Sequence, residues 1–301
     1  MNLFDQLVSQ ALKNQGELAP LQGVVEKELL HHDIIREMST AGLLTGLTFI
    51  GGTCLRTCYG SNRLSEDLDF TGGHDFKRET LSDLGGVLVE RLFAKYGLLV
   101  EVGEPTRDSG SVDTWKLKMI TRPEQKGEPS QRINIDICAI PSYDRRPVVL
   151  RNFYGVDMGT AGLIIQAQSR EEILADKLVA FALRPNRLKN RDIWDICWLK
   201  QNNIDLPLAL IAKKISDHRC TVDRFTNLLS ERSSLLQSDP AVRSGFIHEM
   251  KRFLPHKTVL DTLEHSDFWL YIVSTVQMEC DQIVRFLGKA PAASLWNKFL
   301  F

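Results

Sequence analysis

Two aspartates that stand one residue apart, Asp67 and Asp69, constrain this chain more than any other feature of its sequence. A β-strand repeats every two residues, so both carboxylates project from one face while Leu68 and Phe70 point into a core. Neighbouring carboxylates repel each other and raise each other's pKa. A divalent cation that prefers oxygen ligands relieves this repulsion. The pattern therefore predicts a half-buried strand that holds Mg²⁺ or Mn²⁺ on Asp67 and Asp69.

The segment before this strand has the features of a phosphate-binding turn. Residues 47–50 are apolar, and they are followed by Gly51 and Gly52. Glycines lack the side chains that keep a polyanionic ligand away from the backbone. A helix is expected to begin at Thr53 and to direct its free N–H groups toward the same place. The phosphate-binding turn and the metal pair are thus predicted to lie together.

The combination of strand, double glycine, short helix and Asp-Leu-Asp strand resembles the active-site signature of the nucleotidyltransferase superfamily. More closely, residues 51–53 with Leu55, Arg63, Ser65 and residues 67–70 look like the first motif of the AbiEii/AbiGii toxin family. The similarity covers roughly residues 45–200. It implies an NTP substrate, and the predicted nucleotide-binding residues in this segment are Gly51, Gly52, Thr53, Arg56 and Ser65.

A third carboxylate is predicted on a later strand. Residues 132–137 alternate strictly, so Ile133, Ile135 and Ile137 face a core and Asp136 faces the opposite side. If this strand neighbours the Asp67 strand, Asp136 can complete a second metal site or deprotonate an attacking hydroxyl. The alternative is an aspartate on the solvent face of an edge strand.

A lysine on an apolar helix face is the next candidate. Residues 171–181 are predicted to form a helix after Ser169, and Lys177 falls in the middle of its apolar stripe. The side chain either reaches along the stripe to the surface or extends into a cleft to hold a triphosphate. The segment from Glu172 to Lys177 resembles the Glu-x-x-x-x-Lys-Leu pattern of the toxin family, in which the lysine serves the nucleotide.

The following segment, residues 191–195, resembles the Arg-Asp-x-x-Asp motif of the same family. Asp192 and Asp195 are three residues apart and share a helix face. Asp192 could orient Lys177 or the incoming base, and Asp195 could pair with a neighbouring arginine. The alternative is that both acids lie at a helix N-terminus, where acids are favoured for electrostatic reasons.

The order of elements predicts an α+β fold in which a nucleotidyltransferase-like mixed β-sheet with flanking helices precedes a helical C-terminal domain. The predicted domains are residues 1–160 and residues 161–301, the second completing the nucleotide cleft. Helices are expected over 24–43 and 76–96, with His31 and His32 at the surface or in a capping position. Strands are expected over 98–102, 114–121, 132–140 and 147–150, with a polar connection over 122–131 and mainly helix after residue 165.

Composition limits the partners. The chain has 301 residues with 37 basic and 38 acidic side chains, so no global field attracts a nucleic acid, which must be bound by a local patch. No stretch approaches the length of an apolar membrane span, and the start lacks a secretory signal, so we expect a cytoplasmic protein without a membrane partner. The six cysteines form no Cys-x-x-Cys pair, and no zinc site is predicted.

The resemblance implies a magnesium-dependent enzyme that acts as the toxin of a toxin–antitoxin or phage-defence pair, with a cognate antitoxin as partner. It would transfer NMP from NTP to RNA, with the tRNA 3′ end as the favoured acceptor. Asp67, Asp69, Asp136, Lys177 and Asp192 are its expected catalytic residues. The alternatives are transfer to a protein or small-molecule hydroxyl, or a module that binds NTP or an antitoxin without catalysis.

Overall fold

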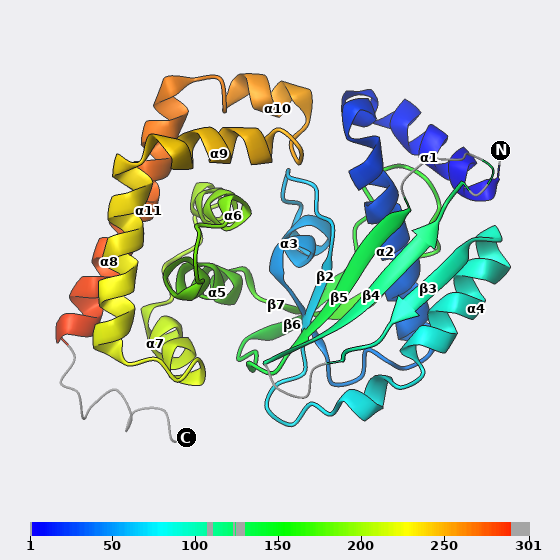
Figure 1. The fold of residues 1–301 in the computed structure, drawn as a ribbon, viewed down its shortest axis with the longest axis horizontal. Helices are drawn as coiled ribbons and strands as arrows, with labels where there is room; N and C mark the ends of the chain where they lie inside the picture. Colours follow the sequence, from blue (N-terminus) through cyan, green and yellow to red (C-terminus); the bar gives the residue numbers. More distant parts are fainter. Residues whose placement is uncertain (1, 107–110, 123, 125–129, 290–301) are drawn as a thin grey trace. The chain divides into compact units, whose positions relative to one another are not determined.

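The computed structural model describes residues 2–106, 111–122, 124 and 130–289. They form two compact units: Met1–Gln168 with Phe253–His256, and Ser169–Arg252 with Lys257–Phe301 (Figure 1). The predicted domain boundary at residue 160 precedes strand β7 (Ile164–Gln168), which belongs to the first unit. No helix in the described ranges is long and apolar enough to cross a membrane.

The first unit is built around a seven-stranded mixed sheet with the order β3-β4-β5-β2-β1-β7-β6. Two pairs, β2 with β5 and β1 with β7, are parallel, and the other neighbours are antiparallel. The predicted mixed sheet is therefore confirmed. The other strands are β1 (Thr48–Ile50), β2 (Leu68–Thr71), β3 (Leu99–Gly103), β4 (Val112–Ile120), β5 (Gln131–Cys138) and β6 (Arg145–Val149).

The helices of this unit are α1 (Leu3–Asn14), α2 (Gln22–Thr40), α3 (Gly51–Tyr59) and α4 (Leu84–Tyr96), with 3₁₀ turns at Gly16–Leu21 and Arg78–Leu81. Helix α2 packs on β5 and α4 packs on β3 (Figure 1). Helix α4 lies on the face of buried Leu117, because Gly85 of α4 packs against Val102, the register partner of Leu117. Helix α2 contacts both β5 and α4, so it lies on the same face. The other face of these strands carries the polar half of the alternating pattern.

Three details of the first unit differ from the prediction. The helix expected over 76–96 begins only at Leu84, and a 3₁₀ turn at Arg78–Leu81 precedes it. The ring of Phe76 lies against Gly72, where an added Cβ would be 2.6 Å from it. Strand β7 and helix α1 were not predicted. In β7 only Ile165 and Ala167 give an apolar alternation, which is too short to recognise without the neighbouring strands. Residues 123 and 125–129 of the polar connection lie outside the described residues.

The second unit is helical, as predicted. Helix α5 (Arg170–Leu183) packs against α6 (Asn190–Gln201), α7 (Leu208–Asp217) and α8 (Val222–Ser238). The remaining helices are α9 (Pro240–Met250), α10 (His256–Asp261), whose first residue belongs to the first unit, and α11 (Ser266–Lys289). Lys214 is buried in this unit, with its Nζ 2.6 Å from Glu172 Oε1 and 3.0 Å from Asp176 Oδ1. A buried cation of this kind requires such partners.

The prediction that His31 and His32 lie at the surface or cap a helix is wrong, because both belong to the middle of α2. Both side chains project from α2 into the interior of the first unit and are buried there. His32 Nδ1 lies 3.0 Å from the hydroxyl oxygen of Thr160, which lies between β6 and β7. The pKa of His32 is lowered to about 4, first by burial and then by the positive charges of neighbouring groups such as Arg56. His32 is therefore neutral at pH 7 in the folded chain.

This burial predicts a pH dependence of stability. Between the unfolded pKa near 6.5 and the folded pKa near 4, the unfolded chain binds a proton that the folded chain excludes, so unfolding becomes easier as pH falls. We expect His32 alone to remove about 2–3 kcal/mol between pH 7.5 and pH 4.5. Urea titrations of the native protein and of His32→Gln measure this, because glutamine does not titrate. An equal loss of stability in both proteins would contradict the assignment.

Candidate active site

The pairing of β2 with β5 brings two of the predicted carboxylates together. The strands are parallel and adjacent, and Asp69 is the register partner of Asp136. This meets the condition under which Asp136 was predicted as a third carboxylate. On the other side, Asp69 is paired in register with Ile50 at the end of β1, immediately before the two glycines. Asp69 therefore lies between Asp136 on one neighbouring strand and the residue before the glycine turn on the other.

Burial follows the predicted alternation. Leu68 and Phe70 are completely buried, whereas Asp67, Asp69 and Asp136 are half-buried. Asp67, which directly precedes β2, accepts a hydrogen bond at 3.1 Å from the backbone N–H of Asn134. Asp136 accepts one at 2.6 Å from the hydroxyl of Thr114 on β4. These bonds orient the two carboxylates on one face of the sheet.

The structure explains the double glycine differently from the prediction. Gly51 has a φ of +75°. A Cβ at Gly51 would lie 2.6 Å from Asp69 Oδ2, and a Cβ at Gly52 would lie 2.1 Å from a guanidinium nitrogen of buried Arg63. Both glycines thus make room for side chains of the same unit. Their predicted contact with the nucleotide stays a prediction.

Thr53 and Ser65 link the glycine helix to the segment that leads into β2. Both are buried, and the Thr53 hydroxyl lies 2.7 Å from Ser65 Oγ and also contacts the carbonyl of Asp67. These hydrogen bonds hold the backbone that carries Asp67. A direct role in phosphate binding stays a prediction, and a completely buried Thr53 side chain favours positioning instead.

Helix α2 holds the same segment from the other side, a function that the sequence interpretation missed. The Ser65 N–H donates to Glu28 Oε1 at 2.8 Å, and His31 Nε2 lies 3.0 Å from the carbonyl oxygen of Glu66. Lys27 pairs with the side chain of Glu66 at 2.8 Å. The sequence did contain a signal, because Glu28 and His31 fall among the apolar positions of the predicted helix 24–43, where polar side chains require partners.

Arg56, predicted to bind the nucleotide, lies in a buried polar cluster. Its Nε is 3.2 Å from Glu28 Oε2, its Nη1 donates to the carbonyl of Ser61 at 3.0 Å, and its guanidinium stacks over the ring of Phe153 at 4.6 Å. The hydroxyl of Tyr154 donates to the same Glu28 carboxylate. These contacts favour a structural role for Arg56, and its contact with a nucleotide stays a prediction.

The remaining predicted residues form a cluster inside the second unit. Lys177 on α5 is 9% exposed, and its Nζ lies 2.6 Å from Asp192 Oδ1 and 2.8 Å from Asp195 Oδ2, both on α6. Arg184 also pairs with Asp192, at 3.2 Å. Burial raises the pKa of Asp192, but Lys177 and the nearby Lys189 and Arg184 outweigh it and hold that pKa well below its usual range. Asp192 thus contacts Lys177, and its role in orienting Lys177 or the incoming base stays a prediction.

The donor chemistry of the sheet face fits a magnesium ion. Among the described residues there is no group of three or more His, Cys, Asp or Glu side chains placed to hold a metal by themselves. Mg²⁺ is usually bound by one or two carboxylates, with water and substrate phosphates completing its coordination. The half-buried pair Asp67 and Asp69 suits that arrangement. The metal itself stays a prediction.

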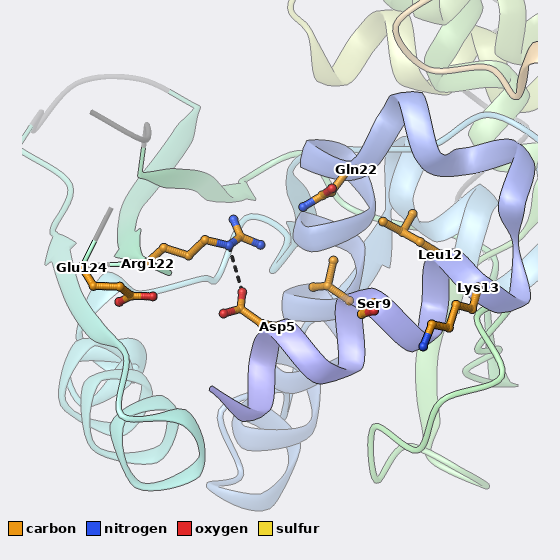
Figure 2. Close-up of a pocket in the computed structure, with 8 residues that line it drawn as sticks. Asp5, Ser9, Leu12, Lys13, Gln22, Arg122 and Glu124 are labelled. Carbon is orange, nitrogen blue, oxygen red and sulfur yellow. Dashed lines mark ion pairs between the residues drawn. The ribbon is translucent and has the colours of Figure 1, made fainter. Parts of the chain in front are cut away.

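A separate hollow of about 620 Å³ lies between α1, the start of α2 and the end of β4 (Figure 2). Arg122 Nε lies 2.9 Å from Asp5 Oδ1 within it, and Arg122 also pairs with Glu26. None of the predicted site residues lines this hollow. The sheet face with the three aspartates, and not this hollow, is therefore the candidate active site.

Comparison with known proteins gives one family and several similar folds. The family model of the "Nucleotidyl transferase AbiEii toxin, Type IV TA system" matches residues 33–269. No curated protein matches the chain. The solved structure of MenT4, a nucleotidyltransferase toxin from Mycobacterium tuberculosis H37Rv, is similar, with 16% identity, a TM-score of 0.64, and coverage of 95% of this chain and 91% of that chain. JHP933 from Helicobacter pylori has 18% identity, a TM-score of 0.50 and coverage of 87% and 94%.

The contact between Gly51 and Asp69 predicts the effect of a single methyl group. Gly51→Ala should cost about 1 kcal/mol or more in stability for the positive φ, and it should also displace the Asp69 carboxylate. A displacement near 1 Å lowers turnover about 10²-fold. Gly46→Ala is the matched control, because Gly46 has a φ of +80° and nothing within 4 Å of an added Cβ. Urea unfolding and kcat measure the two effects, and equal kcat values in the two variants would refute the positional argument.

The Lys177 cluster predicts a loss of stability that the sequence did not indicate. From the apolar stripe alone, Lys177→Met should be harmless or stabilising. The structure reverses this expectation, because methionine would leave the buried carboxylates of Asp192 and Asp195 without their lysine, at a cost of about 3–5 kcal/mol. Urea unfolding measures the loss. Lys257→Met, at an exposed position of the second unit, is the control and should change little; equal stability of the two variants would contradict the account.

Proposed function

The chain belongs to the AbiEii nucleotidyltransferase toxin family of type IV toxin–antitoxin systems, and we propose that it transfers NMP from NTP to an RNA hydroxyl, with the 3′ end of tRNA as the favoured acceptor. The observation that supports this proposal is the register of β2 and β5, which aligns Asp69 with Asp136 beside Asp67. The cognate antitoxin is the expected protein partner, and the cytoplasm is the compartment where NTP, tRNA and antitoxin meet.

The aspartates have separate proposed roles. Asp67 and Asp69 would hold Mg²⁺ or Mn²⁺, which when bound would supply charge neutralisation for the phosphates of the NTP. Asp136 accepts the proton of the acceptor hydroxyl as that oxygen attacks the α-phosphorus and pyrophosphate leaves. Positioning of the two substrates provides most of the acceleration in such a transfer.

The Lys177 cluster is proposed to serve the nucleotide. The resemblance to the family motif supports this role, and the ion pairs with Asp192 and Asp195 hold the ammonium group in a defined place. A charge-assisted contact to a phosphate contributes about 1.5–3 kcal/mol, so NTP binding should weaken roughly 10- to 150-fold in Lys177→Met. This is measured by calorimetry under conditions in which the variant remains folded. Unchanged affinity would return Lys177 to a purely structural role.

The test of the function is incubation of the protein with total RNA and each of the four labelled NTPs, followed by mapping of the extended 3′ ends. Labelling of a protein or of a small molecule instead of RNA would favour the second candidate acceptor class. Labelling of nothing, with NTP still bound, would favour a non-catalytic module.

Substitution of the aspartates tests their roles. Asp69→Ala should abolish transfer and any growth toxicity while the fold is kept. Asp136→Asn should keep the hydrogen bond from Thr114, because the amide oxygen still accepts it, and should leave NTP binding intact while turnover falls about 10²-fold or more. Asp83→Ala is the matched control, because Asp83 is exposed and its side chain makes no capping bond to α4. Near-normal turnover in folded Asp69→Ala would disprove the assignment.

A further inference from the structure

The polar face that carries Asp136 continues from β5 onto β4. The two strands are antiparallel, and their register pairs Thr114 with Asp136, Lys116 with Asn134 and Lys118 with Arg132. Residues two apart on a strand share a face, so these side chains form successive rows across the sheet. The row of Asp136 is followed by a row with Lys116 and then by a row with Lys118 and Arg132.

Burial confirms which side of the sheet these rows occupy. The intervening residues Ile133 and Ile135 on β5 and Leu117 on β4 are buried on the face that α2 and α4 cover. Lys116 and Arg132, in contrast, are exposed. The basic side chains therefore lie on the same face as the catalytic carboxylates.

The charges on this face are only partly neutralised. Lys118 pairs with Glu101 of β3 at 2.9 Å, between side chains that are 40% and 65% exposed. Within the described residues the structure records no ion pair for Lys116 or Arg132. Lys118 and Arg132 are like charges directly opposite each other on adjacent strands, an arrangement that destabilises a sheet. A bound polyanion would relieve that repulsion.

We propose that Lys116 and Arg132 bind backbone phosphates of the acceptor RNA upstream of its reacting end, an inference that rests on the proposed function. Residues of one strand face are about 6.6–6.8 Å apart, so the Lys116 row lies roughly 7 Å from the Asp136 row and the Arg132 row roughly 13 Å. Lys116 contacts the phosphate nearer the attacking hydroxyl, and Arg132 contacts one farther along. The nearly neutral chain thus has a local basic patch where an RNA strand must enter.

The test compares acceptors of different length. The variant is Lys116→Gln/Arg132→Gln, which removes two exposed charges. The control is Lys13→Gln/Arg91→Gln, with the same charge change at exposed positions of α1 and α4. Helix α4 covers the opposite sheet face, and α1 packs on α2, which covers it too. Thermal unfolding should give similar stabilities for both proteins. KM and kcat are measured with the RNA identified by end mapping and with its terminal dinucleotide, at several salt concentrations.

The proposal predicts a length-dependent defect. With full-length RNA, KM should rise about 10-fold in the variant and the salt dependence of log KM should flatten by about 1.4, since each lost single-strand phosphate contact accounts for about 0.7. With the dinucleotide, which offers no distant phosphate, the defect should be small. The KM for NTP should be unchanged. Arg132→Gln alone should affect only longer acceptors, and Lys116→Gln should already affect shorter ones.

Three results would overturn the proposal. If the wild-type protein extends RNA but the variant has the control's KM and salt slope, the surface does not bind the acceptor, although the proposed function stands. If kcat falls equally with full-length RNA and with the dinucleotide, the residues act through Asp136 and not on the acceptor backbone. If the wild-type protein extends no RNA and labels a protein or small molecule instead, both the proposed function and this surface are refuted.

Discussion

The parallel pairing of β2 with β5 is the constraint on which the rest of the candidate site depends. It aligns Asp69 with Asp136 from segments that lie 67 residues apart in sequence. A parallel pair needs a long connection along the chain. Here the segment that connects β2 to β5 contains α4, β3 and β4. Those inserted strands extend the same polar face beyond the carboxylates. The connection that makes the pairing possible therefore also supplies the basic surface proposed for the acceptor.

Much of the first unit serves to hold the short segment before β2. Glu28 and His31 of α2 bind its backbone, and Thr53 of α3 binds it from the glycine helix. Glu28 also pairs with buried Arg56, so a single carboxylate joins α2, α3 and the Ser65 segment. Such buried networks are costly when one member is missing, because the remaining polar groups have no access to water. The complete network holds the backbone of Asp67 in a fixed position.

The second unit uses buried charge in the same way. Lys177 lies between Asp192 and Asp195, and Lys214 lies between Glu172 and Asp176. Each lysine pairs with two carboxylates, so neither is an uncompensated buried charge. The Lys177 cluster differs because Arg184 also pairs with Asp192, giving two cations and two carboxylates. The Lys177 cluster is therefore charge-balanced, whereas the Lys214 cluster has one more carboxylate than cations.

The sequence by itself determined the alternation that separates Asp67, Asp69 and Asp136 from a core, the helix that carries Lys177, and the family resemblance, because these depend on short spacings along one chain. Only the tertiary structure decided which strands are neighbours, since pairing between distant segments leaves no local pattern. It decided that Gly51 and Gly52 face Asp69 and Arg63, that His31 and His32 are buried, and that β7 joins the sheet. The partners of a buried polar side chain come from segments that are distant in sequence, and no local sequence pattern indicates which segments will pack together.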